Sequence, residues 1–390
     1  MKKLFKDVSV KCAAFLMAYY ITNAVFQSYM SLFYADRGMS NTQIGLINAL
    51  IALVSIFSMQ LWGAIGDGAK KRNLLLCFMC LGSAAIMLVT HFANGIFMFT
   101  LLACLFAFIY TSIQPMGDSI VLTSLEKENR PFGPVRTCGG MAFAVMCMLY
   151  GYVTDAFSSE IVVYSVCALC VLSAAAAMYL PRVGGGQKKD RSGMLRLFKD
   201  KELLKLFLLM IPLQITMGYF YAFFSPFVRD DMNGGTILGW CYFISATSEV
   251  PFLILSDKLF KKYGAGRLMC FSALTLFIRW TLVATAGGIV QVVLSQLFHC
   301  WGFIVITVTL SKYVQATVPD EKKASGQMLI SVFGFGVARV IGYFGGGVLS
   351  DMLSRQSVFY ISAAVCLVCF VISAPYYLKH SPLNGAGKSA

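Results

Sequence analysis

Twelve stretches of mostly apolar residues, each about 20 residues or longer, alternate with short polar gaps along this chain of 390 residues. A helix that crosses the hydrocarbon core of a bilayer needs roughly 20 such residues, and it satisfies its own backbone groups. The pattern therefore predicts an all-α membrane protein with twelve transmembrane helices. The expected spans are residues 10–34, 42–65, 73–92, 96–122, 134–154, 160–180, 203–228, 237–256, 267–286, 289–311, 325–350 and 357–378.

The positive charge occupies every second gap. The two ends of the chain and the alternate gaps between them hold 27 of the 32 Lys and Arg residues. Cytoplasmic loops carry this excess in membrane proteins, so we expect an even number of spans with both termini in the cytoplasm. The distribution also accounts for the net charge of +14 without a nucleic-acid partner, because a basic nucleic-acid binder gathers its charge on one soluble face.

Composition narrows the function classes further. Hydrophobic residues make up 58% of the chain and charged residues 13%, which leaves too little polar surface for a soluble globule. The gaps are too short for an enzyme domain, and no HExxH, GxSxG or P-loop motif occurs. The three CxxC pairs lie inside apolar spans, where thiols pack as small hydrophobic groups. We therefore expect no catalytic residue, metal or cofactor, and a first span that is retained rather than cleaved.

One long polar stretch divides the spans six and six. We predict an N-terminal six-helix bundle (1–182), a cytoplasmic linker (183–202) and a C-terminal six-helix bundle (203–390), with residues 194–205 forming an amphipathic surface helix. The halves echo each other: the gap after span 2 and the gap after span 8 both carry an Asp followed by a basic cluster, and spans 5 and 11 both end near an Asp. Such repeats are typical of transporters that bind their solute near the bilayer midplane.

The residues Gly63, Asp67, Lys71 and Arg72 resemble the signature between spans 2 and 3 of the major facilitator superfamily. The resemblance implies a transporter of the inner membrane that works by alternating access. It also implies a conformational latch at these four residues and at Asp257 in the second half. Asp67 is expected to cap a helix N-terminus and to pair with an Arg of the neighbouring bundle.

Ionisable side chains at membrane depth are costly, so each suggests a function. Asp118 and Arg136 lie 18 residues apart on spans 4 and 5, where an Arg fork can hold the carboxylate and still donate to solute hydroxyls; a purely structural ion pair is the alternative. The spacing resembles the sugar-contacting pair of lactose-permease-like oligosaccharide–proton symporters. The same resemblance makes Phe143 a sugar-stacking position and extends to the nucleoside–proton symporters.

The second half offers candidates for proton coupling. Arg279 and His299 match an Arg and a His that the resemblance assigns to coupling, although Gly302 replaces the Glu that follows the His in that branch. Glu249 precedes Pro251, which interrupts its helix, and a dehydrated carboxylate takes up a proton readily. A structural pairing of Glu249 with Arg279 is the alternative.

Polar and aromatic side chains on other spans suit a polar, ring-bearing solute. We predict proton-coupled uptake of a sugar, oligosaccharide or nucleoside-like solute by a monomer in the lipid bilayer. The alternatives are a proton-driven exporter of amphipathic compounds and, from another class, a non-transporting membrane sensor or a membrane-embedded enzyme. The further solute-binding candidates are Asn23, Phe26, Gln27, Gln114, Tyr219 and Trp240.

Overall fold

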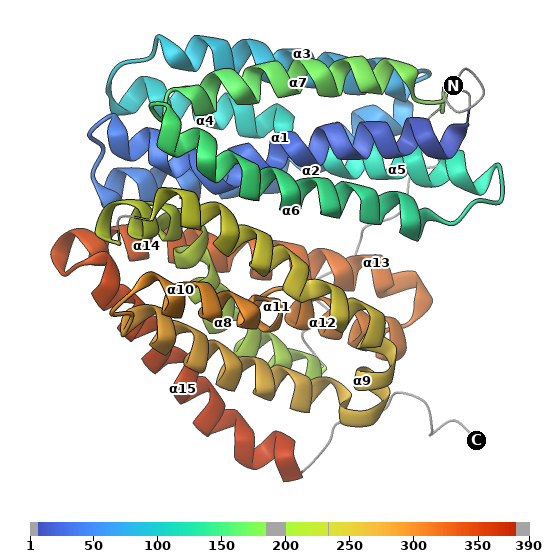
Figure 1. The fold of residues 1–390 in the computed structure, drawn as a ribbon. Helices are drawn as coiled ribbons and strands as arrows, with labels where there is room; N and C mark the ends of the chain where they lie inside the picture. The colour runs from blue at the N-terminus through green and yellow to red at the C-terminus, as the bar shows by residue number, and fades with distance from the viewer. Residues whose placement is uncertain (1–6, 185–199, 233, 380–390) are drawn as a thin grey trace, which may run out of the picture. The chain divides into compact units, whose positions relative to one another are not determined.

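The computed structural model describes residues 7–184, 200–232 and 234–379, without the side chains of residues 320–322 and 324. This part of the chain consists of helices and short turns and contains no strand (Figure 1). Eleven helical stretches within it are long and apolar enough to cross a membrane. The prediction of an all-α, multi-pass membrane protein is confirmed.

The longest helical stretch, α9 (Gly235–Ala284), contains two of the twelve predicted spans. This explains why eleven stretches correspond to twelve spans. At Gly264 the backbone turns with φ 74° and ψ 168°, a conformation that glycine adopts without the strain a side chain causes. The predicted spans 237–256 and 267–286 lie on either side of this turn. Two helices, one for each predicted span, thus meet at this turn.

The described residues fold as two compact units. Unit 1 consists of residues 1–39, 50–189 and 233–243. Within it α1 packs against α6 and α7, and α3 packs against α4 and α7. Its helices are α1 (Val8–Asp36), α2 (Asn41–Gly68) from residue 50 onward, α3 (Arg72–His91), α4 (Gly95–Tyr110), α5 (Ile113–Glu126), α6 (Phe132–Ala156) and α7 (Ile161–Tyr179).

Unit 2 consists of residues 40–49, 190–232 and 244–390. Helix α8 packs against α14 and α15 at its centre. Besides the rest of α9, its elements are α8 (Lys201–Pro226), η3 (Phe227–Asp231), α10 (Ile289–Ser295), η4 (Gln296–Phe298), α11 (His299–Gly302), α12 (Ile304–Thr317), α13 (Asp320–Leu329), η5 (Ile330–Val337), α14 (Ala338–Met352) and α15 (Arg355–Lys379).

Two helices begin in one unit and continue in the other. The first residues of α2 pack in unit 2, where a Cβ added at Gly45 would lie 2.3 Å from the carbonyl oxygen of Tyr343. The first residues of α9 pack in unit 1, where a Cβ at Gly239 would lie 2.6 Å from the carbonyl oxygen of Met148. Glycine allows both close backbone approaches, as small residues commonly do between membrane helices.

Three of the spans are not regular α-helices. The predicted span 96–122 is interrupted at residues 111–112 between α4 and α5, and the span 289–311 is assembled from α10, η4, α11 and α12. The span 325–350 contains the π-helix η5. Irregular backbone at membrane depth occurs where protein or a polar cavity satisfies it, and π-bulges are frequent at functional sites.

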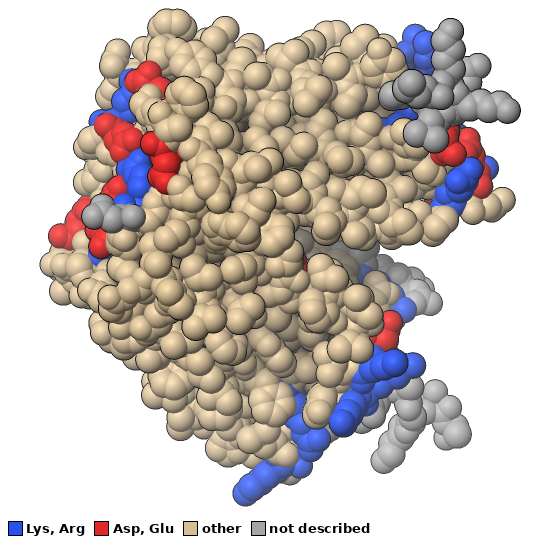
Figure 2. Space-filling model, viewed as in Figure 1, with Lys and Arg blue, Asp and Glu red and all other residues tan. Residues whose placement is uncertain are grey.

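Charged side chains gather near the ends of the helices in each unit, and few lie between them on the face shown in Figure 2. This is the surface expected of helices embedded in a bilayer. Most of the predicted linker (183–202) and most of the predicted amphipathic helix (194–205) lie outside the described residues, since residues 185–199 are not described. The six-and-six division of the chain stays a prediction.

Candidate solute and proton site

Four side chains of unit 1, three of them predicted from the sequence, form one polar cluster. Gln114 on α5 donates a 2.6 Å hydrogen bond to the hydroxyl of Tyr20 on α1. The guanidinium of Arg136, on α6, lies 4.2 Å from the centre of the Tyr20 ring. Asp118 lies one turn after Gln114 and acts electrostatically on both Tyr20 and Arg136. The structure therefore brings together Asp118, Arg136 and Gln114, and it adds Tyr20, which the sequence did not single out.

Asp118 and Arg136 approach each other without a salt bridge among the described residues. The Oδ1 atom of Asp118 is buried and has no hydrogen-bond partner in the described part of the chain. Arg136 is half-buried and stacks on Tyr20. An unsatisfied buried oxygen is costly, so this arrangement favours a ligand that donates a hydrogen bond to Asp118.

The other unit 1 candidates extend the polar and aromatic lining. Asn23 donates to Gln27 over 3.1 Å along one face of α1. Between them, the Phe26 ring contacts Phe106 at a centroid distance of 4.6 Å. Phe143 lies half-buried on α6.

Trp240 belongs to the start of α9 and packs in unit 1. Its side chain is 40% exposed, and its indole nitrogen lies 3.2 Å from the hydroxyl of Tyr152. The Trp240 ring also contacts the Phe243 ring edge to face at a centroid distance of 5.9 Å. It stays a stacking candidate.

Unit 2 holds a deeper polar cluster. The Nε2 atom of His299 lies 3.8 Å from the Oε1 atom of Glu249. Arg279, which is fully buried, donates a 2.8 Å hydrogen bond to Gln296, and Ser245 donates to the same amide oxygen over 2.9 Å. The three predicted coupling residues therefore lie in one buried region. The contact between Glu249 and His299 was not anticipated, because the sequence only suggested Arg279 as a partner.

Tyr219 lies in the core of unit 2. Its ring is 2% exposed, and its hydroxyl donates to the carbonyl of Arg355 over 2.8 Å and contacts the Ser350 hydroxyl at 3.0 Å. A satisfied buried tyrosine of this kind ties α8 to the junction of α14 and α15. Its predicted solute contact stays a prediction.

The superfamily signature forms a compact buried contact in unit 1. Arg72 is 7% exposed; it donates to the carbonyl of Gly66 over 2.8 Å and pairs with Asp67 at 2.6 Å. Gly63 lies one turn earlier on α2, and Lys71 precedes α3 without making a side-chain cap. Here Asp67 pairs within its own signature, so its pairing with the neighbouring bundle stays a prediction.

The corresponding Asp of the second half makes an exposed contact. Asp257 on α9 pairs with Lys312 on α12 in unit 2, and Lys312 also donates to Ser256 over 3.1 Å. The Asp257 side chain is 85% exposed. The two predicted latch aspartates therefore differ strongly in burial.

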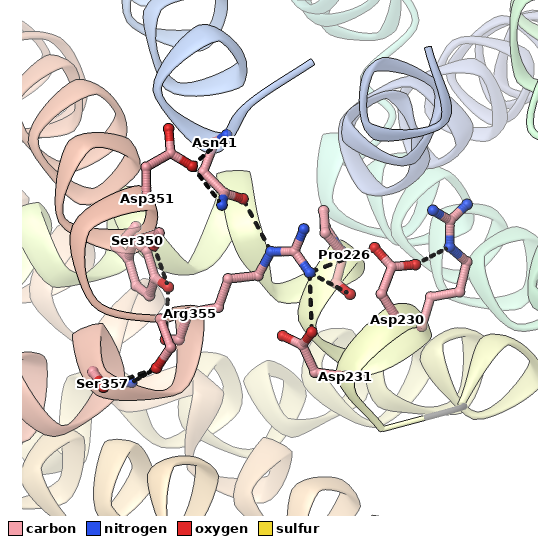
Figure 3. A network of polar contacts seen from close by, with 11 residues as sticks. Asn41, Pro226, Asp230, Asp231, Ser350, Asp351, Arg355 and Ser357 are labelled. Atoms are coloured by element: carbon pink, nitrogen blue, oxygen red, sulfur yellow. Dashed lines mark hydrogen bonds and ion pairs between the residues drawn. The ribbon is translucent and has the colours of Figure 1, made fainter. Parts of the chain in front are cut away.

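A polar network at another edge of unit 2 was missed from the sequence (Figure 3). Asp351, at the end of α14, accepts hydrogen bonds from the backbone N–H groups of Asn41 (3.0 Å) and Thr42 (2.7 Å) at the start of α2. Arg355 donates to the Asn41 side chain over 3.0 Å and pairs with Asp231 at 3.2 Å. A carboxylate placed at the start of a helix stabilises that helix, because it accepts hydrogen bonds from the free N–H groups and interacts favourably with the helix dipole.

Comparison with known proteins agrees with this architecture. The chain matches the MFS_1 like family over residues 9–361. It is 23% identical to the maltose permease of Geobacillus stearothermophilus over 96% of this chain and 95% of that protein. It is 22% identical to the putative nucleoside transporter YegT of Escherichia coli (strain K12), over 83% and 80% of the two chains.

A solved structure has the same fold. The crystal structure of the nucleoside transporter NupG superposes with a TM-score of 0.84 at 17% sequence identity, and the match covers 96% of this chain and 100% of that chain. At this identity the likeness shows the fold alone. The relatives are transporters, so the expectation that this chain is not an enzyme is confirmed. The chain belongs to the MFS_1 like family and is a multi-pass membrane transporter of the major facilitator superfamily.

Proposed function

We propose that the chain imports a polar solute, of the sugar, oligosaccharide or nucleoside kind, together with protons. The solute class is supported by two relatives that are named as a maltose permease and a putative nucleoside transporter. Proton coupling is supported by one observation above the others, the 3.8 Å contact between Glu249 and His299 inside unit 2.

In this proposal the unit 1 cluster binds the solute. Asp118 offers an acceptor that no described residue uses, and Arg136 offers donors from a position fixed by the Tyr20 ring. A sugar or nucleoside hydroxyl both donates and accepts, so it can satisfy both groups at once. Phe26, Phe143 and Trp240 supply faces on which a ring can stack.

The unit 2 cluster carries the proton. A carboxylate and an imidazole in contact at membrane depth can pass one proton between them, and ionisable groups at this depth commonly mark proton pathways. The Arg279–Gln296–Ser245 hydrogen bonds hold a fixed positive charge next to this pair. That charge favours the ionised state of Glu249 once the proton has left.

The remaining expectations belong to the same proposal. They are a monomer in the inner membrane with both termini in the cytoplasm, two six-helix bundles that alternate access, and a latch at Gly63, Asp67, Lys71, Arg72 and Asp257. The charge distribution along the sequence supports the orientation.

The test is solute-induced thermal stabilisation of the purified protein, since a ligand of the folded state raises its apparent stability. Disaccharides, monosaccharides, nucleosides and small aromatic acids are screened against the wild type and Asp118→Asn. A stabilising polar solute that loses its effect in the variant supports the proposal. Stabilisation by lipophilic cations alone overturns it in favour of an exporter.

A further inference from the structure

Arg339 lies in a cradle of aromatic rings inside unit 2. It follows directly after the π-helix η5, at the start of α14. Its guanidinium carbon lies 4.6 Å from the ring centre of Tyr221, 4.9 Å from Phe335 and 5.9 Å from Phe303. These rings come from α8, from η5 and from the junction of α11 and α12. Three separate segments therefore converge on one positive charge.

This charge has no counter-ion in the described part of the protein. Arg339 makes no hydrogen bond or ion pair with any described residue, and its Nε atom is buried without an acceptor. Arg339 as a whole is partly exposed, and its two terminal nitrogens are not among the buried atoms that lack a partner. Arg339 thus presents the open end of its guanidinium fork from an otherwise enclosed position.

The surroundings are electropositive. Tyr221, which stacks against Arg339, lies 3.5 Å from the Nε2 atom of His299, and the same nitrogen lies near Glu249. Arg279 contributes a second guanidinium and acts electrostatically on His299 together with Arg339. Two arginines therefore share this region with one carboxylate. Cation–π contacts offset only part of the cost of an arginine at membrane depth, so the region has room for one more negative charge.

The backbone that carries Arg339 packs closely against α8. A Cβ added at Gly218 on α8 would lie 3.1 Å from the Cα atom of Arg339 and 3.4 Å from Gly342, which shows how closely α8 and α14 approach. The segments that supply Phe335 and Phe303 are a π-helix and a break between two helices. Interrupted helices mark binding sites in many transporters.

We propose that Arg339 is a specificity-determining residue that binds a carboxylate on the transported solute. This proposal rests on the proposed function and narrows it: the solute is a monoanion, such as a sugar acid, rather than a neutral sugar or nucleoside. The planar guanidinium matches a carboxylate through two parallel hydrogen bonds from its terminal nitrogens. One carboxylate would neutralise the charge of Arg339, which no described residue pairs with. A phosphate monoester carries more negative charge than this single arginine neutralises.

The experiment compares matched acidic and neutral probes on the purified full-length protein. The pairs are D-glucuronate with D-glucose and D-galacturonate with D-galactose, and glucose 6-phosphate is the phosphate probe. Thermal stabilisation is measured for the wild type, Arg339→Met, Arg339→Lys and the control Arg267→Met. Arg267 lies elsewhere on α9, and its guanidinium donates to the carbonyl of Leu378, so its loss removes a cation outside the cradle.

We expect a sugar acid to stabilise the wild type and the Arg267→Met control, and its neutral partner to have a smaller effect. Affinity for the acid falls about tenfold or more in Arg339→Met, since a charge-assisted pair is lost, and Arg339→Lys retains part of it. Without solute, Arg339→Met melts at the wild-type temperature or above, because an uncompensated charge is removed. A lower melting point in that variant identifies a structural arginine and overturns the proposal.

Other outcomes separate this proposal from the one on which it rests. If neutral sugars or nucleosides bind as tightly as acids and Asp118→Asn abolishes their binding, the transport proposal stands and the role of Arg339 falls. If acids bind through Arg339 but move no protons in vesicles, the role of Arg339 stands and proton coupling falls. Stabilisation by the phosphate probe alone, or by no anion at all, also overturns the carboxylate assignment.

Discussion

The two units hold their polar residues in different ways. In unit 1, Asp118 and Arg136 are half-buried, they approach without a salt bridge, and one carboxylate oxygen is left without a partner. In unit 2, Arg279 is fully buried and is bonded to Gln296, and His299 is 5% exposed and lies against Glu249. The buried Nδ1 atom of His299 also has no hydrogen-bond partner in the described part of the chain, so the two clusters differ in exposure. Half-buried groups suit an exchangeable ligand, whereas enclosed groups suit a proton, which needs no space.

The largest effect should come from removing the carboxylate of unit 2. Glu249→Gln keeps the shape of the side chain but cannot release a proton, so accumulation driven by a pH gradient should disappear. With one proton per solute, a gradient of one pH unit supports about tenfold accumulation. Uptake into proteoliposomes measures this. Exchange of solute without a gradient should persist in the variant. If this exchange is lost, Glu249 is also needed for solute binding or for folding.

The enclosed character of unit 2 should appear as a stability difference. Gln296→Leu removes an acceptor of the fully buried Arg279, and an unsatisfied buried charge-assisted donor costs about 1–3 kcal/mol. Thermal unfolding in detergent should show a clear loss. Gln114→Leu is the matched change in unit 1, where the half-buried Gln114 hydrogen-bonds to Tyr20 and Asp118. It should alter solute affinity more than stability, and equal destabilisation by both changes would contradict the distinction.

Two neighbouring glycines on α6 test whether Tyr20 belongs to the solute site of unit 1. A Cβ at Gly139 would lie 2.6 Å from the Tyr20 ring, whereas a Cβ at Gly140 would meet nothing within 4 Å. Gly139→Ala should displace Tyr20, and with it the ring on which Arg136 rests, so that solute affinity falls several-fold. Gly140→Ala is the control and should bind as the wild type does. Identical binding curves for the two variants would remove Tyr20 from the site.

The smallest effect should separate the two predicted latch aspartates. Asp257→Asn should leave unfolding unchanged, because exposed ion pairs contribute little. Asp67→Asn should cost about 1–2 kcal/mol, since it removes the negative charge that pairs with the buried Arg72 guanidinium. Thermal unfolding of both variants in detergent checks this contrast. A larger loss in Asp257→Asn would show that its exposed contact is the more important of the two.

Much of the fold could be predicted from the sequence, because period, length and charge act locally. The apolar stretches and the alternation of Lys and Arg specify twelve spans, and the turn at Gly264 separates two of them as expected. The interruptions of three spans were not predicted. They depend on packing between helices and leave no clear pattern in composition.

The candidate site could be predicted only in part. The spacing of Asp118 and Arg136 and of Arg279 and His299 directed attention to the helices that carry the two polar clusters. The cradle of Arg339 was missed because its rings come from Tyr221, Phe303 and Phe335, which are distant in the sequence. The contact of Asp351 with Asn41 joins residues 310 positions apart. Only the echo between the ends of spans 5 and 11 hinted that an Asp at this position has a role.

The separate roles of Asp118 in solute binding and of Glu249 in proton coupling are tested most directly by measuring solute binding to Asp118→Asn and Glu249→Gln side by side. Thermal stabilisation by one solute that binds the wild type is recorded for both variants over a range of concentrations. The account predicts that binding is lost in Asp118→Asn and retained in Glu249→Gln. Retained binding in Asp118→Asn, or lost binding in a folded Glu249→Gln, would contradict it.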